Sequence, residues 1–127
     1  MRYTPKQIEK YQRQKYIAHL EKIGKNLFRM FRDPGVGAGK FLNRFDELMG
    51  RLDELEKIRL DSEYLRESES HYRQLHRRIH DGDFDDRMLG EMRENGMSEL
   101  NRLQKMKNRS SYKKEKHRER VRRDGWE

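Results

Sequence analysis

Apolar side chains recur at intervals of three and four residues over the first quarter of the chain. From Tyr16 onward the steps are 4, 3, 4 and then 3 or 4, which is the spacing of one face of an α-helix. This pattern predicts an amphipathic helix. The residues of the predicted apolar stripe are Ile8, Tyr11, Tyr16, Leu20, Ile23, Leu27 and Met30 or Phe31.

The ends of this helix carry recognisable signals. Thr4 is a good N-cap, Pro5 suits the first helical position, and Gln7 occupies the third position of a capping box. Asp33 precedes Pro34 and therefore avoids the α conformation. We predict a basic N-terminal helix within residues 1–32, followed by a glycine-rich loop over residues 33–39.

A second apolar pattern follows the loop and predicts a long central helix over residues 40–80. Its first part has steps of 4, 3, 4 and 3, which is typical of a short coiled-coil seam and suggests self-association into a homo-oligomer. After the seam the pattern jumps by three residues to Ile58, a stammer in the heptad repeat. The seam residues are Phe41, Phe45, Leu48, Leu52 and Leu55.

Beyond residue 80 the helical pattern is interrupted twice. Asp81-Gly82-Asp83 predicts a turn, a short helix contains Met88, and Asn95-Gly96 predicts a further break. The predicted segments are an acidic turn with a short helix over residues 81–97 and a basic helix or tail over residues 98–127. The predicted fold is all-α: an elongated helical hairpin with a short coiled-coil seam plus the basic C-terminal segment.

Charge is unevenly distributed along this small, highly charged chain. Charged residues make up 43% of the 127 residues and hydrophobic ones 31%, too few apolar residues for a thick core. Residues 1–40 carry a net charge of +7, residues 41–100 carry −6, and residues 101–127 carry +7. Cysteine is absent, which excludes disulfides. No apolar run approaches the length of a membrane span, so we expect no membrane partner and a cytoplasmic protein, or a nuclear one in a eukaryote.

The two basic ends point to a nucleic-acid partner, with RNA slightly favoured over DNA. No sequence-reading motif is visible, so contacts to phosphates are expected. Tyr112 and Trp126 lie among cations and are candidates for stacking on bases. The candidate phosphate-binding residues are Lys6, Lys10, Arg13, Lys15, Lys105, Lys107, Arg109, Lys113, Lys114, Lys116, Arg118, Arg120, Arg122 and Arg123.

Two other functions stay open at this point. The chain has the composition of a protein–protein adaptor, inhibitor or assembly scaffold, of the kind found among phage and plasmid accessory factors. Such a protein would dock through its central helix and place the basic tail on an acidic protein surface. A subunit of a ribonucleoprotein is the third possibility.

Several motifs resemble catalytic or metal sites without completing one. The loop ending in Lys40-Phe41 lacks the first glycine and the hydroxyl of a Walker motif, although its amides and Lys40 could hold a single phosphate. The acidic run at residues 81–86 lacks the glycine and glutamate of a calcium loop. His76 and His80 have the spacing of two metal ligands on one helix face, but no third ligand has clear spacing. We therefore assign no enzyme activity, no cofactor and no metal site from the sequence.

Overall fold

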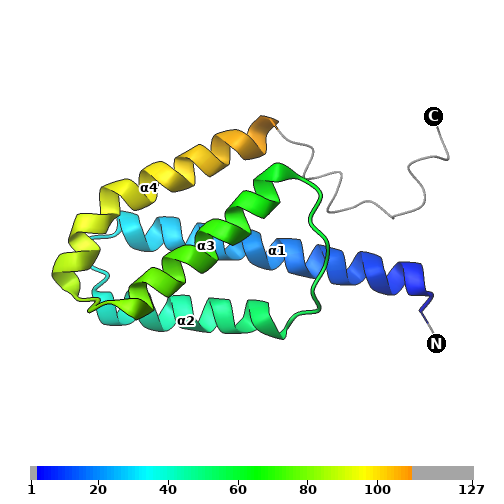
Figure 1. The fold of residues 1–127 in the computed structure, drawn as a ribbon, viewed down its shortest axis with the longest axis horizontal. Coiled ribbons are helices and arrows are strands. Elements are labelled where there is room, and N and C mark those ends of the chain that lie inside the picture. Colours follow the sequence, from blue (N-terminus) through cyan, green and yellow to red (C-terminus); the bar gives the residue numbers. More distant parts are fainter. Residues whose placement is uncertain (1–2, 110–127) are drawn as a thin grey trace.

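The computed structural model describes residues 3–109, and this part of the chain forms four α-helices (Figure 1). They are α1 (Pro5–Arg32), α2 (Ala38–Glu54), α3 (Glu63–Asp81) and α4 (Asp86–Arg109). The longest, α1, forms a hairpin with α2, α3 crosses the pair, and α4 returns along α1. The all-α prediction, with a helical hairpin, is confirmed.

The predicted boundaries of α1 are confirmed at both ends. Thr4 accepts a hydrogen bond from the Gln7 amide at 3.2 Å, and the Thr4 amide donates to Gln7 Oε1 at 2.8 Å, which completes the capping box. The helix ends at Arg32, with Asp33 in an extended conformation before Pro34.

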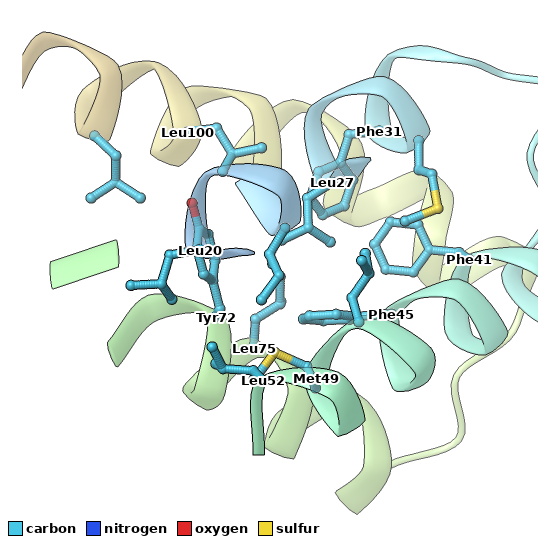
Figure 2. Close-up of a cluster of buried hydrophobic side chains, with 14 of the residues drawn as sticks. Leu20, Leu27, Phe31, Phe41, Phe45, Met49, Leu52, Tyr72, Leu75 and Leu100 are labelled. Carbon is cyan, nitrogen blue, oxygen red and sulfur yellow. The ribbon is translucent and has the colours of Figure 1, made fainter. Parts of the chain in front are cut away.

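One hydrophobic core joins all four helices (Figure 2). Phe31 of α1 lies 5.0 Å from Phe41 of α2, measured between ring centroids, and Phe41 contacts Phe45 edge to face at 6.0 Å. Four of the five predicted seam residues are fully buried in this core and Leu55 packs against it. The seam residues therefore pack within one chain, and they are not exposed for self-association with a second copy.

The structure differs from the prediction of one helix over residues 40–80. The chain leaves the helix after Glu54 and runs extended to Ser62, whose side chain caps α3 by accepting from the Leu65 amide at 3.2 Å. A continuous helix of this length would extend about 60 Å, whereas the 28 residues of α1 span about 42 Å, so part of it would project beyond α1 without a partner. The reversal buries Leu60, and Arg13 and Arg66 donate to main-chain carbonyls of the link. The three-residue jump to Ile58 was the only sequence signal at this place.

The predicted break at Asn95-Gly96 is absent, because α4 runs through it without interruption. Gly96 instead lies against the Phe31 side chain of α1. A Cβ atom at this position would lie 2.6 Å from two ring carbons of Phe31. The glycine is therefore a packing residue inside a helix.

Arg93 of α4 forms hydrogen bonds to the C-terminal end of α1. Its guanidinium donates to the carbonyls of Met30 and Phe31 at 2.8 Å each, of Asp33 at 2.9 Å and of Val36 at 2.6 Å. Carbonyls in the last turn of a helix have no partner within the helix, so one side chain satisfies the end of α1 and the following turn together.

We expect Gly96→Ala to destabilise the fold by about 1–3 kcal/mol, because the added methyl group overlaps the buried Phe31 ring. Gly90→Ala is the matched control in the same helix, since a Cβ there meets nothing within 4 Å. This control should gain up to about 1 kcal/mol from helix propensity. Urea unfolding followed by circular dichroism measures both, and equal shifts in the two variants would contradict the packing role of Gly96.

We expect Arg93→Met to lower the free energy of unfolding by about 3 kcal/mol, the upper end of the range for hydrogen bonds made by a charged group. Methionine keeps an apolar stem but removes every donor to the four carbonyls. The control is Arg87→Met on an exposed position of α4, where only the Arg87–Glu91 ion pair at 3.4 Å is lost. That change should cost less than about 0.5 kcal/mol in the same unfolding experiment.

Candidate nucleic-acid interface

The face of α1 opposite the core is a stripe of exposed cations, here called the α1 ridge. It consists of Lys15, Lys22, Lys25, Arg29 and Arg32, separated by steps of 7, 3, 4 and 3 residues. These intervals place all five side chains along one side of the helix. Of the two acidic residues of α1, Glu9 lies outside the stripe, whereas Glu21 borders it four residues before Lys25.

The ridge cations are not neutralised by neighbouring carboxylates. Within residues 3–109, none of the five forms an ion pair. Two of them contact aromatic rings instead: Lys15 lies 5.4 Å from the centroid of Tyr11, and Arg32 lies 5.7 Å from that of Phe28. Their positive charge therefore remains available to an anionic partner.

A groove of about 370 Å³ separates α1 from the second half of α4. Its rim carries three ridge cations, Lys25, Arg29 and Arg32, together with Lys107 of α4, and Glu21 is its acidic residue. Besides Asn101 and Gln104, the lining includes apolar and aromatic side chains, so cations and a hydrophobic surface meet in one place. These lining residues are Phe28, Tyr64, Tyr72, Leu100 and Leu103.

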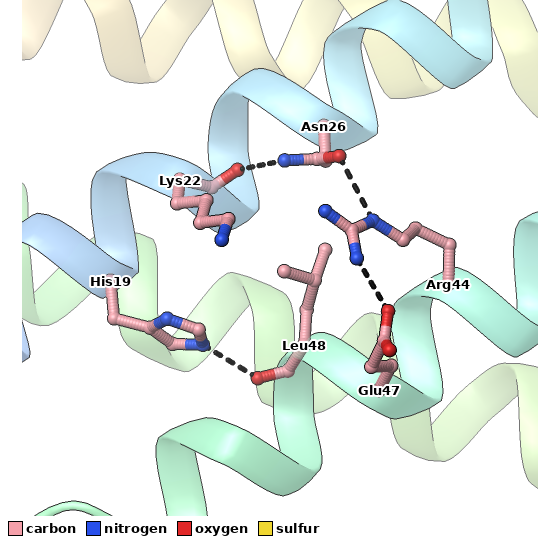
Figure 3. A network of polar contacts seen from close by, with 6 residues as sticks. All are labelled: His19, Lys22, Asn26, Arg44, Glu47 and Leu48. Atoms are coloured by element: carbon pink, nitrogen blue, oxygen red, sulfur yellow. Dashed lines mark hydrogen bonds and ion pairs between the residues drawn. The ribbon is translucent and has the colours of Figure 1, made fainter.

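On its other side the ridge continues onto α2 through a polar network (Figure 3). Asn26 donates to the Lys22 carbonyl at 2.8 Å and accepts from Arg44 Nε at 3.2 Å, and Arg44 also pairs with Glu47. One turn earlier, His19 donates from Nε2 to the Leu48 carbonyl at 2.8 Å. These contacts hold Arg44 beside the ridge. Lys40 and Arg51 are exposed on the same helix, in grooves that α2 shares with α1.

The candidate cations of the N-terminal segment have different environments. Lys6 and Lys15 are exposed, and Lys10 is half-buried. The prediction that Arg13 binds phosphate is wrong. This residue is only 4% exposed, and its guanidinium donates to the Arg59 carbonyl at 3.1 Å. It supports the link between α2 and α3 and does not face a ligand.

The candidate residues of the C-terminal segment are only partly within the described chain. Lys105 and Arg109 are exposed near the end of α4, and Lys107 lines the α1–α4 groove. The remaining candidates lie outside the described residues: Lys113, Lys114, Lys116, Arg118, Arg120, Arg122, Arg123, Tyr112 and Trp126.

The possible phosphate site at the start of α2 is also corrected by the structure. Asp86 Oδ1 accepts a hydrogen bond from the Ala38 amide at 2.7 Å, so a carboxylate of α4 already caps this helix. The neighbouring Asp85 caps α4 itself by accepting from the Met88 amide at 2.8 Å. The acidic run at residues 81–86 thus contributes two helix caps.

The histidine pair lies beside a carboxylate that the sequence did not reveal. Asp46 of α2 places Oδ1 at 2.6 Å from Nε2 of both His76 and His80. Although partial burial of Asp46 opposes it, hydrogen bonds from His80 and His76 hold the pKa of this carboxyl below its usual value.

Sequence reasoning missed four of the five ridge residues, because it counted charge by segment and stopped at Lys15. The missing residues are Lys22, Lys25, Arg29 and Arg32. Their spacing of 3, 4 and 3 was a usable signal, since it is the periodicity that identified the apolar face of the same helix.

Comparison with family models, with curated proteins and with solved structures found no match for this chain. Among the described residues, no helix has the length and apolar character needed to cross a membrane.

Proposed function

We propose that this protein binds nucleic acid, with RNA favoured, through contacts of the α1 ridge with backbone phosphates. The observation that supports the proposal is a stripe of five exposed cations with no ion pair to a carboxylate in the described chain. Phosphate binding by Lys and Arg is favoured by the release of condensed counterions, and it requires no base-specific contact.

The dimensions of the ridge suit an extended polyanion. Lys15 and Arg32 are 17 residues apart along α1, which corresponds to about 26 Å of helix axis. Lys40 and Arg51 of α2 widen the cationic surface on one side, and Lys107 of α4 widens it on the other. A surface of this kind would track a phosphate backbone without selecting a sequence.

The α1–α4 groove supports a single-stranded form of the ligand. Proteins that bind single strands combine cations for the phosphates with aromatic or apolar side chains for unstacked bases. Phe28 and Tyr64 line this groove beside Lys25 and Arg29. The sequence of residues 110–127 adds seven further cations, an arginine-rich composition that often accompanies RNA binding.

The alternative is an adaptor that docks through the central helix and places the basic tail on an acidic protein surface. The apolar seam of that helix is buried in the core at Phe41, Phe45, Leu48 and Leu52, so a partner would have to contact its polar face. An acidic protein segment lying on the α1 ridge is a further form of that hypothesis.

The decisive experiment measures binding of a labelled single-stranded RNA by fluorescence anisotropy over a range of salt concentrations. The test variant is Lys22→Gln/Lys25→Gln/Arg29→Gln on the ridge. We expect weaker binding at low salt and a reduction of about 2 in the slope of log K against log salt, because each contact with a single strand contributes about 0.7.

The matched control is Lys57→Gln/Arg77→Gln/Arg78→Gln, which removes the same charge from exposed positions outside α1. It should keep the wild-type slope. Equal losses of RNA affinity in the two triple variants would show that net charge alone drives binding. If the wild type does not bind RNA at low salt, the proposal is refuted. A chain truncated after Arg109 separates the contribution of the ridge from that of residues 110–127.

A further inference from the structure

Asp46, His76 and His80 converge at one point between α2 and α3. The two histidines lie one turn apart on α3, with ring centroids separated by 4.6 Å. Both direct Nε2 toward the same atom, Asp46 Oδ1, at 2.6 Å. The three ligand atoms all lie within 4.8 Å of one another.

We propose that these three residues form a binding site for a divalent transition-metal ion, with Zn²⁺ as the best fit. Imidazole nitrogen and carboxylate oxygen are ligands that Zn²⁺ accepts together, and two histidines with a carboxylate make a three-residue set that leaves a fourth position for water. The chain has no cysteine, so a thiolate-rich site is excluded.

The ligands project from rigid elements. Asp46 follows Phe45, a fully buried core residue of α2, and His76 packs edge to face against the Phe45 ring at 4.9 Å. His76 follows buried Leu75, and His80 follows buried Ile79. Core packing therefore fixes the distance between the two helices, as a preorganised metal site requires.

The spacing needs only a small adjustment to admit an ion. With metal–ligand distances of about 2.0–2.1 Å, ligand atoms in a tetrahedral site stand about 3.3 Å apart. Each nitrogen–oxygen separation of 2.6 Å would therefore widen by about 0.7 Å. Asp46 and His80 can make this change because their side chains are 42% and 46% exposed.

Charge and access also suit a dication. The cluster offers one carboxylate oxygen and two imidazole nitrogens, and imidazole in its neutral form is a common ligand of divalent transition metals. Arg77 and Arg78 of α3 are exposed, and helix geometry turns them away from the face shared by His76 and His80. The partly exposed ligands leave a path for the ion from solvent.

Metal binding at this point would join α2 to α3 across the reversal at residues 55–62. An ion that binds the folded chain and not the unfolded one shifts unfolding to higher temperature. The site thus predicts two independent observables, a saturable stoichiometry of one ion per chain and a rise in melting temperature. Neither depends on nucleic-acid binding.

The test uses the full chain, stripped of metal and titrated with Co²⁺ and with Zn²⁺. We expect Co²⁺ to produce a visible absorption band typical of a tetrahedral site. The band should reach its maximum at one equivalent of Co²⁺, and Zn²⁺ should displace the bound Co²⁺. Asp46→Asn and His80→Gln should each weaken Zn²⁺ affinity by more than about tenfold and abolish the Zn²⁺-dependent rise in melting temperature. Circular dichroism establishes that both variants are folded.

Glu47→Gln is the matched control for Asp46→Asn. Glu47 is the next residue on α2, is exposed, and pairs with Arg44 outside the cluster. It should bind Zn²⁺ as the wild type does. The proposal is overturned if the wild type shows no saturable one-to-one binding. It is also overturned if Asp46→Asn and His80→Gln retain the wild-type affinity as Glu47→Gln does, because the metal would then bind elsewhere on the chain.

Discussion

The attachment of Arg93 to four main-chain carbonyls determines how α4 lies on the rest of the molecule. Those carbonyls belong to the last turn of α1 and to the turn before α2, so one side chain fixes three segments relative to one another. A chain with 31% hydrophobic residues has little apolar surface for this task. Because the contact sets the register of α4 along α1, it also places Gly96 on Phe31 and Lys107 at the rim of the groove.

The same arrangement explains why positive charge accumulates on α1. Carboxylates from the acidic centre of the chain pair with basic residues on other helices: Asp53 with Arg73, Glu67 with Arg102, and Asp46 with two histidines. These contacts connect α2, α3 and α4 and leave the outer face of α1 without a counterpart. The segregation of charge seen along the sequence is therefore kept in space, with α1 as its cationic side, and this is the basis of the proposed function.

Much of α1 was predictable from sequence, while the rest of the fold was less so. Thr4 and Pro34 mark its ends by local chemistry, and its apolar stripe was placed correctly from Tyr16 onward. Ile8 and Tyr11 were assigned to the same stripe, yet they are exposed, because this end of α1 projects beyond the other helices (Figure 1). The helix break after Glu54 contains neither glycine nor proline, so the three-residue jump to Ile58 was its only signal in the sequence. At Gly96 the sequence predicted a helix break that does not exist. This glycine lies inside α4, where it allows close packing against α1.

The sequence by itself determined which faces of the helices are apolar, where α1 begins and ends, and that cations greatly outnumber carboxylates at both ends of the chain. These are local properties, since helical periodicity and capping involve residues a few positions apart. The tertiary structure alone decided that Arg13 is buried, that Asp86 caps α2, and that Asp46 meets His76 and His80 from 30 and 34 residues away. Such contacts depend on the reversals between helices, whose direction is set by the burial of the whole core and not by any short segment.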